Sequence, residues 1–323
     1  MLAVWLIPQA QAAESKAGIS FQVENDFFAG LTDRHFTNGL RVSGLVDRTV
    51  FNDWAEELAP NFPTIRREDI DAVIIGIGQS MYTPENIASR SVVQNDRPYA
   101  GWLYGTLGIL AEEDDPETGG STLKTLALDI GVTGPLSLGE QVQKRWHKTF
   151  GLQKPNGWGH QIKTEPGAIL TFDYKSRRPL GGSGPFKFDL TPQAGFALGN
   201  IMTYGAAGVT LRMGDNLNLD YGPPRIRPSL PGSALVRRVD DFGWYLFTGV
   251  EGRLVARNIF LQGNSFANSH GVKRKPWVVD LQSGAAITYD RYRLSLTYVV
   301  RSEEFDGQDG PDIFGALSLT VSF

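Results

Sequence analysis

The side chain best suited to proton transfer in this chain is His147, one of four histidines among 323 residues. Histidine exchanges protons near neutral pH and is the most common general base in enzymes. His147 lies in the stretch GPLSLGEQVQKRWHKTFG (residues 134–151), while most of the surrounding sequence is rich in strand and turn residues. It is therefore either a catalytic base or a surface residue on a connecting segment, and other parts of the sequence are needed to distinguish these interpretations.

A second group of polar residues occurs near the N-terminus, in ENDFF (residues 24–28) and HFTNG (residues 35–39). Asn25, Asp26 and Thr37 offer amide, carboxylate and hydroxyl oxygens, and such oxygens can bind a hard cation such as Ca²⁺. The alternative is that the Asn-Asp pair marks an ordinary turn at a strand end. We interpret Asn25 and Asp26 as candidate metal ligands.

Together these two groups could hydrolyse an ester. His147 would take a proton from water, and a bound cation would stabilise the negative charge that develops on the carbonyl oxygen. No G-x-S-x-G sequence is present, and no serine lies in a recognisable nucleophile elbow. The sequence thus favours attack by water over an acyl-serine intermediate.

The element that must position His147 is predicted to be a single helix. Ser137 followed three residues later by Glu140 is a capping-box sequence, which is typical of a helix start. Residues 141–150 contain neither Pro nor Gly, and Gly151 stands where a helix-ending glycine is common.

Most of the remaining chain predicts strands, and the last two are the most informative. In residues 292–301 and 313–323, apolar or aromatic side chains largely alternate with small, polar or charged ones. Arg293 and Arg301 lie opposite a fully apolar face. This pattern, over runs of about 10 residues, is typical of a transmembrane β-barrel with lipid outside and a polar interior. A soluble sandwich has the same period with its apolar face inward, but the arginines, the long loops and the C-terminal Phe323 favour the barrel.

We predict an all-β fold, a transmembrane antiparallel barrel spanning residues 13–323, with about twelve strands and a short helix in an extracellular loop. The first two strands are predicted at residues 19–28 and 36–46. A pair of strands is predicted between residues 242 and 263, and the polar, Pro-rich residues 215–233 are predicted to form an extended loop.

Counting the strands up and down from a periplasmic N-terminus places the candidate residues at one outer rim of the barrel. Strand alternation directs Glu24 and Asp26 inward and Asn25 toward lipid, where a polar side chain is costly. We therefore expect a bend that turns Asn25 inward. The narrow interior is expected to hold ion pairs from a set of inward charged residues: Asp129, Glu251, Arg253, Arg293 and Arg301.

Composition excludes several classes of protein. A net charge of −4 gives no basic signal for nucleic acid, and the absence of cysteine excludes disulfides and Cys-based metal sites. A mean hydropathy of −0.20 argues against a bundle of membrane helices. Residues 1–12 combine an apolar run with the small-x-small sequence Ala10-Gln11-Ala12, which predicts a residual signal peptide; the alternative is a disordered tail.

Several segments carry a resemblance to a known family. They are ENDFF, FTNG, QSMYTP (residues 79–84), NDRPYAGWLY (residues 95–104), DIGVTGP (residues 129–135) and GEQVQKRWHKTFG (residues 139–151). Together they resemble the lipid A deacylase family LpxR, over most of the mature chain.

The resemblance implies a twelve-stranded outer-membrane barrel that removes the 3′-linked acyloxyacyl group of lipid A in a Ca²⁺-dependent reaction. Its active site is expected at the outer-leaflet end, between the barrel wall and extracellular loops. The catalytic histidine of the family corresponds to His147, its Asn-Asp pair to Asn25 and Asp26, and its strand-two threonine to Thr37. The expected partners are lipopolysaccharide and the outer membrane, and the expected state is a monomer.

This chain departs from the family at two positions. Gln153 stands where the family has an acidic residue, and Glu165 in the next loop could compensate for it. Ala100 stands where the family has a serine. A further residue, Arg97, could bind a lipid phosphate because a guanidinium matches phosphate oxygens, or it could form a salt bridge inside the barrel.

Three functions are therefore compared. The first is an outer-membrane carboxylic ester hydrolase acting on lipid A. The second is a non-enzymatic barrel, either structural or a pore, and the third is a phospholipase on the same scaffold. The lumen discriminates between the first two, because a filled lumen disfavours a pore.

Overall fold

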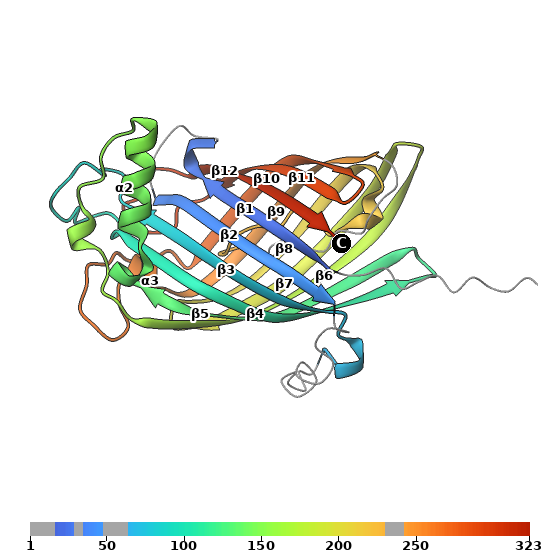
Figure 1. The fold of residues 1–323 in the computed structure, drawn as a ribbon, viewed down its shortest axis with the longest axis horizontal. Coiled ribbons are helices and arrows are strands. Elements are labelled where there is room, and N and C mark those ends of the chain that lie inside the picture. Colours follow the sequence, from blue (N-terminus) through green and yellow to red (C-terminus); the bar gives the residue numbers. More distant parts are fainter. Residues whose placement is uncertain (1–16, 29–34, 48–63, 230–241) are drawn as a thin grey trace, which may run out of the picture.

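The computed structural model describes residues 17–28, 35–47, 64–229 and 242–323. The predicted signal peptide, residues 1–12, lies outside these described residues. The described chain forms a closed antiparallel barrel of twelve strands, in which each strand pairs with its neighbours in sequence and the first pairs with the last (Figure 1). The predicted all-β barrel is confirmed.

The strands are β1 (Gly18–Asn25), β2 (His35–Asp47), β3 (Ala72–Thr83), β4 (Ala100–Asp115), β5 (Gly120–Thr133), β6 (Pro166–Ser183), β7 (Phe186–Gly199), β8 (Met202–Asp215), β9 (Phe242–Asn258), β10 (Trp277–Tyr289), β11 (Tyr292–Arg301) and β12 (Asp312–Ser322). The predicted pair of strands between residues 242 and 263 is wrong. Residues 242–258 form β9 alone, and a short helix, α3 (Ile259–Gln262), follows because the Asn258 side chain caps it by accepting a hydrogen bond from the Phe260 amide.

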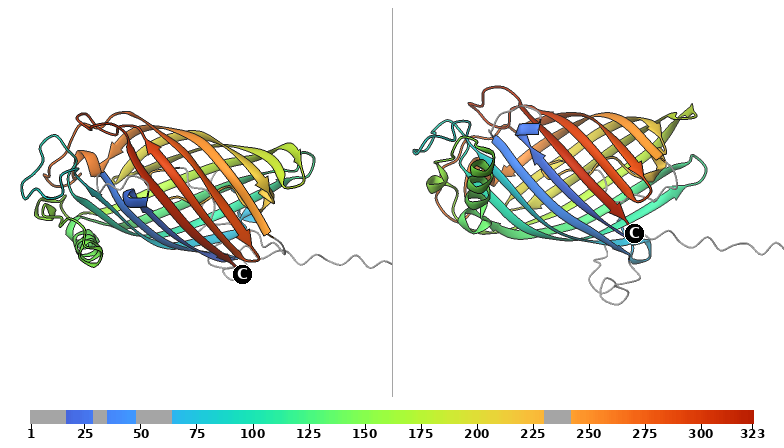
Figure 2. Two further views of the ribbon diagram at one scale, coloured as in Figure 1. Left: turned by 90° about the horizontal axis from the view of Figure 1, so that it is seen from above. Right: turned by 45° about the horizontal axis from the view of Figure 1, so that its top comes forward.

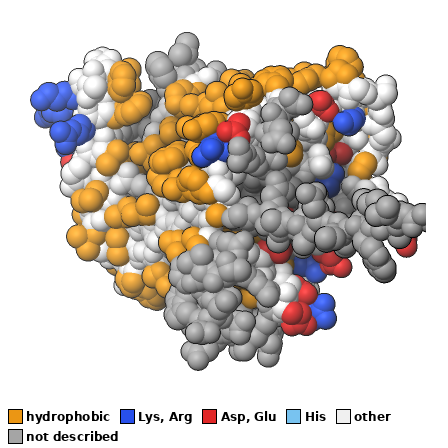
Figure 3. All heavy atoms as spheres, turned by 45° about the vertical axis from the view of Figure 1, so that its right-hand side comes forward, with side chains coloured by type: hydrophobic (Ala, Val, Ile, Leu, Met, Phe, Trp, Pro, Cys, Tyr) orange, Lys and Arg blue, Asp and Glu red, His pale blue; other side chains and the backbone are white. Residues whose placement is uncertain are grey.

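The predicted alternation places apolar residues outside and polar residues inside. In β11, Leu294, Leu296 and Tyr298 are exposed, whereas Arg293 and Arg301 are buried in the lumen. Hydrophobic side chains cover much of the wall in the view of Figure 3. Of the helices in the described ranges, none is long and apolar enough to cross a membrane.

Of the charged residues predicted to pair in the lumen, Glu251, Arg253, Arg293 and Arg301 form ion pairs, whereas Asp129 accepts a hydrogen bond from the Thr106 hydroxyl. The Asp280 carboxylate accepts two hydrogen bonds from Arg253, at 2.7 and 3.0 Å, and two from Arg301, both at 2.9 Å. Arg253 also pairs with Glu251 at 2.7 Å. Because these buried charges face opposite charges at hydrogen-bonding distance, the desolvation cost of burying them is offset.

A segment between β8 and β9, residues 216–229, also lies in the lumen, and we call it the luminal segment. It begins with the turn η6 (Leu217–Leu219) and is largely buried, so the expected extended loop is instead folded into the barrel. Asp220 pairs there with Arg212 and Arg293. The Arg227 guanidinium donates to Asp173 at 2.7 Å. These ion pairs with interior residues therefore hold the luminal segment inside the barrel.

The predicted helix is α2 (Gly139–Phe150), in the loop between β5 and β6. It lies against the outside of the wall, at the end of the barrel that also carries α3; we call this the helix end (Figures 1 and 2). Gly151 ends α2 in the left-handed conformation, as predicted. The predicted capping box is wrong: Ser137 belongs to the preceding turn η4 (Gly134–Ser137), and its hydroxyl donates to the Gly134 carbonyl at 2.6 Å.

Candidate functional site

A cavity of about 350 Å³ lies between α2 and the outer side of β1, β2 and β3. Its polar lining comes from two distant parts of the chain: Asn25, Asp26, Thr37, Asn38, Gln143, His147 and Gln153. The structure thus brings His147 together with Asn25, Asp26 and Thr37, although they are far apart in the sequence. A larger hollow of about 1040 Å³ elsewhere on the molecule contains none of these residues.

Asn25 reaches the cavity without the expected inward turn. It remains in register as the last residue of β1, opposite Asn38 of β2 and Gly315 of β12. It lines the cavity with Val23, which shares the outer face of the wall, so the predicted inward rotation is wrong. Asn25 is nevertheless only 5% exposed, because the loop that carries α2 covers this part of the wall. The strand ends at Asn25, and Asp26 begins the turn η1 (Asp26–Phe28).

Thr37 reaches the cavity through an irregularity in β2. The register between β2 and β3 shifts between Phe36 and Asn38, so Thr37 is an extra residue in the strand. Phe36 packs in the interior, whereas Thr37 and Asn38 both line the cavity. The hydroxyls of Thr37 and Thr83 lie 2.7 Å apart. The bulge therefore lets two consecutive polar residues face the same site.

His147 is buried in the cavity wall, with a ring orientation that suits a general base. Its Nδ1 is hydrogen-bonded to the backbone carbonyl of Gln153. Because a carbonyl can only accept, Nδ1 carries the hydrogen and Nε2 carries the lone pair. The left-handed turn at Gly151 brings residue 153 back toward the helix, so the local chain path sets the tautomer of its own histidine.

The sequence analysis missed two polar residues among the described lining of the cavity, Gln143 and Asn38. Gln143 precedes His147 by four residues and therefore lies on the same face of α2. Its side-chain oxygen accepts a hydrogen bond of 2.7 Å from the Trp158 indole, which fixes the orientation of the amide. Four-residue spacing from His147 was the available signal for Gln143, and cross-strand pairing with Asn25 was the signal for Asn38.

The lining of the cavity has the chemistry of a cation site of low charge. Asp26 is its one carboxylate, and no Lys or Arg is among the described residues that line it. Within the described part of the chain, no group of three or more His, Cys, Asp or Glu residues could hold a metal ion. The amide and hydroxyl oxygens of Asn25 and Thr37 can add to the carboxylate, and this all-oxygen donor set fits Ca²⁺ better than a softer metal.

Glu165 does not take the place of the missing acidic residue. Its carboxylate accepts hydrogen bonds from the Asn264 side chain at 2.9 Å and from the Ser265 and Phe266 amides at 3.0 and 3.2 Å. Burial raises the pKa of Glu165, but these hydrogen bonds outweigh burial and hold the pKa below its usual value. Glu165 therefore anchors the loop after α3, and Gln153 remains at the cavity.

Two other predicted positions lie away from the cavity. Arg97 is buried, pairs with Glu304 at 3.3 Å, and stacks over the Tyr82 ring at 4.8 Å. This geometry favours the internal salt bridge over phosphate binding. Ala100 is the first residue of β4 and packs in the interior cluster with Phe36.

Known proteins that this chain resembles include one family and several solved structures. A family model described as "Outer membrane protein LpxR" matches residues 1–323. Among solved structures, LpxR from Salmonella typhimurium matches with a TM-score of 0.76 and 22% sequence identity, covering 95% of this chain and 100% of that chain. The β domain of the Bordetella autotransporter BrkA matches with a TM-score of 0.49 and 9% identity, covering 95% and 100%. No curated protein sequence matches significantly.

Proposed function

The chain belongs to the LpxR family of outer-membrane proteins, and from this premise we propose that it is a hydrolase that removes an ester-linked acyl chain, the 3′-acyloxyacyl group, from lipid A. The observation that carries the proposal is the single cavity that His147 shares with Asn25, Asp26 and Thr37. A proton acceptor and a set of oxygen donors within one cavity are the components of water-mediated ester hydrolysis.

The position of the cavity supports a lipid substrate. Its apolar lining includes Val23 and Leu40, which lie on the same outer face as the exposed Phe21 and Val42. An acyl chain can therefore reach the cavity along the lipid-facing wall without leaving an apolar environment. Trp146, which is 42% exposed on α2, lines the cavity as well.

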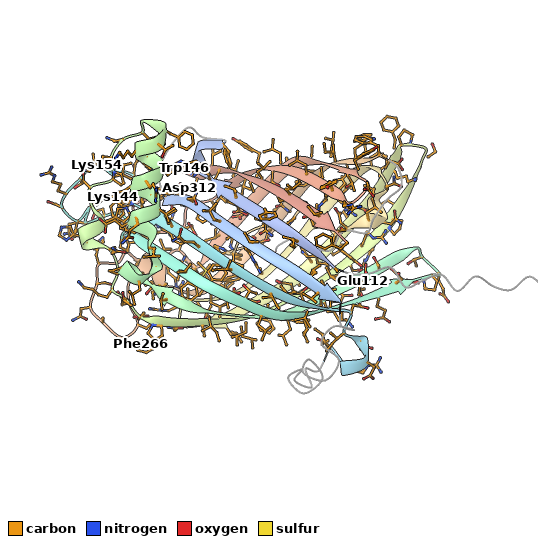
Figure 4. The ribbon with its side chains drawn as sticks, in the orientation of Figure 1. Glu112, Lys144, Trp146, Lys154, Phe266 and Asp312 are labelled. Carbon is orange, nitrogen blue, oxygen red and sulfur yellow. The ribbon has the colours of Figure 1, made fainter. Side chains whose placement is uncertain are left out.

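The surroundings of α2 supply positive charge for an anionic lipid. Lys144 and Lys154 are exposed at the helix end, and Glu112 lies at the opposite end of the barrel (Figure 4). Lys154 directly follows the cavity residue Gln153. Lys154 is better placed than the buried Arg97 to meet a lipid phosphate, whereas Lys144 already pairs with Glu140.

In the proposed reaction, His147 Nε2 takes a proton from water as the water oxygen attacks the ester carbonyl carbon. The tetrahedral intermediate then releases the sugar oxygen, which receives that proton from the imidazolium, leaving a free fatty acid and a hydroxyl group. Asn25 and Asp26 would hold Ca²⁺, which when bound supplies positive charge for the developing oxyanion. The Gln153 carbonyl keeps the ring in the required tautomer and stabilises the imidazolium.

The filled lumen argues against the pore alternative. The luminal segment and the ion pairs around Asp280 and Asp220 occupy the interior. A phospholipase on the same scaffold would use the same cavity and the same His147. The two activities differ in their products, so the experiment below separates them.

The test is mass spectrometry of total lipids from a Gram-negative host that expresses the wild type, His147→Ala or His160→Ala. His160 is an exposed histidine in the same loop and bonds the Arg90 carbonyl, so it is a matched control. We expect loss of an acyloxyacyl mass from lipid A with the wild type and His160→Ala. With His147→Ala the rate should fall by roughly 10²- to 10⁴-fold.

Calcium dependence is tested on isolated membranes with and without a chelator. We expect chelation to stop the reaction and added Ca²⁺ to restore it. Unchanged lipid A from folded wild-type protein would overturn the proposal, and lysophospholipids in its place would identify a phospholipase. Equal loss of activity in both histidine variants would exclude a specific role for His147.

A further inference from the structure

The wall that carries the candidate site has a second contact on its inner side. Asn25 and Asn38 pair across β1 and β2 and line the outer cavity. The adjacent pair, Glu24 and Gly39, faces the opposite side of the sheet, because alternate residues of a strand point to opposite faces. Both inner residues contact the tip of the luminal segment, Arg225 and Ile226.

Glu24 makes the polar part of this contact. It is 1% exposed, and its Oε1 accepts a hydrogen bond of 2.6 Å from the Ile226 backbone amide. The Arg225 guanidinium lies 3.6 Å from the same carboxylate oxygen. Glu24 directly precedes Asn25, so this contact fixes the last residues of β1 from within the barrel.

Gly39 makes the apolar part. A Cβ atom added at Gly39 would lie 2.9 Å from Ile226 Cδ1 and 3.0 Å from Phe36 Cζ. The Ile226 side chain therefore packs directly on the backbone of β2, in the space that a larger residue at position 39 would need. Gly39 directly follows the cavity residues Thr37 and Asn38, next to the bulge.

The tip is itself held from several directions. Arg225 lies 3.7 Å from Asp280 and 3.4 Å from the Gln282 side chain. Arg301 donates to the Pro228 carbonyl at 2.9 Å, and Arg227 donates to Asp173 at 2.7 Å. A tip anchored to β6, β10 and β11 in this way can hold the β1–β2 wall in one position.

We propose that the tip of the luminal segment is a positioning element for the site, and that Ile226 and Glu24 are positioning residues that fix Asn25, Asp26, Thr37 and Asn38 from the inner side of the wall. The inference rests on the proposed function for its catalytic consequence, but not for its structural one. Close packing transmits a displacement at Ile226 to the outer side, because the wall is a single sheet. If the segment only filled the lumen, the site would not depend on its tip.

The test is a double-mutant cycle in the full-length protein in lipid bilayers, with Gly39→Ala, Ile226→Ala and the double variant. The first readout is hydrogen exchange of the amides of residues 18–28 and 35–47, which requires no activity. We expect faster exchange in each single variant, and partial recovery in the double variant because Ile226→Ala makes room for the new Cβ. Ile226→Val serves if Ile226→Ala does not fold.

The second readout is the kinetics of lipid A hydrolysis. We expect kcat to fall by roughly 10- to 100-fold in each single variant with KM nearly unchanged, because misplaced groups slow the chemical step. Leu217→Ala is the matched control: it removes a buried side chain at the base of the luminal segment, among Tyr245 and Phe247 and away from the tip. It should leave both the wall exchange and kcat unchanged.

The outcomes separate the two proposals. Normal exchange and normal kcat in folded Ile226→Ala would overturn the positioning role, as would equal effects from Leu217→Ala. Faster wall exchange in Ile226→Ala without any hydrolysis by the wild type would support the positioning role while rejecting the proposed function.

Discussion

The lumen and the outer cavity lie on the two sides of the same wall, and both bury polar groups. In the lumen, carboxylates face guanidinium groups: Asp280 meets Arg253 and Arg301, and Asp220 meets Arg212 and Arg293. In the cavity, no described Lys or Arg lines the wall beside Asp26. These luminal charges are therefore paired with one another, whereas the described lining of the cavity combines a carboxylate with amide, hydroxyl and imidazole groups.

This difference teaches which buried polar groups are structural. Opposite charges that hydrogen-bond to each other have their desolvation offset within the fold, and they offer little to a ligand. A carboxylate among neutral oxygen donors is suited to an external cation instead. We therefore expect that replacing an acidic residue in the lumen reduces stability, and that replacing the acidic residue in the cavity reduces activity.

The largest effect on stability is expected from Asp280→Asn. The asparagine would turn an NH₂ group toward Arg253 or Arg301 and leave buried guanidinium groups without a counter-charge. We expect the free energy of unfolding to fall by about 3–5 kcal/mol, as measured by urea unfolding of the barrel in detergent micelles.

Asp306→Asn is the matched control for Asp280→Asn. Asp306 pairs with Lys273 at 3.0 Å, but both side chains are exposed, so the expected loss is below about 1 kcal/mol. A comparable loss in both variants would show that burial of the lumen pairs does not determine their contribution.

The complementary variant in the cavity is Asp26→Asn. The substitution keeps the size of the side chain and removes the single carboxylate of the proposed cation site. We expect lipid A hydrolysis to slow by about 100-fold or more, because the cation would be lost. The free energy of unfolding should fall less than in Asp280→Asn, because the amide retains one oxygen acceptor. A stability loss as large as that of Asp280→Asn would remove the distinction between the two sides of the wall.

The sequence was sufficient for the architecture, and it predicted that residues that line the cavity would meet at one end of the barrel. Strand alternation predicted which face of β11 meets lipid, and the ENDFF, FTNG and helix segments identified Asn25, Asp26, Thr37 and His147. Each segment is local, but the expectation that they meet came from counting strands along the barrel and from the resemblance to the family. Gly151 was likewise predicted as the residue that ends α2.

Tertiary contacts determined what the sequence could not predict. Alternation gave the correct side of the wall for Asn25, but the docking of the α2 loop, rather than an inward bend, keeps it from lipid. The sequence predicted only a polar loop for the luminal segment. Its partners in the lumen, such as Asp173 and Glu24, are distant in sequence and could not be identified from the local pattern. Ser137 was assigned to the helix start, but the tight turn after Gly134 uses its hydroxyl.

Gln153→Glu sharpens the comparison by adding negative charge to the cavity. His147 is held by the backbone carbonyl of residue 153, so the substitution leaves that hydrogen bond in place. A second carboxylate should lower the Ca²⁺ concentration for half-maximal activity by about tenfold, because ligand charge raises calcium affinity. Gln153→Ala is the control and should change that concentration little. An unchanged concentration in Gln153→Glu would mean that side chain 153 lies beyond reach of the cation.

The smallest effect is expected from Glu165→Gln. Glu165 anchors the Asn264–Phe266 loop instead of the cavity, so hydrolysis should change by less than about twofold. Because the pKa of Glu165 is held below its usual value of 4.5, its anchoring is complete above pH 4.5 and is lost as the pH falls through the lowered pKa. Limited proteolysis of this loop should therefore increase in acid for the wild type, whereas Glu165→Gln should be susceptible already at neutral pH. A large loss of Ca²⁺-dependent activity in Glu165→Gln would instead show that Glu165 acts at the site and that Gln153 does not contribute to it.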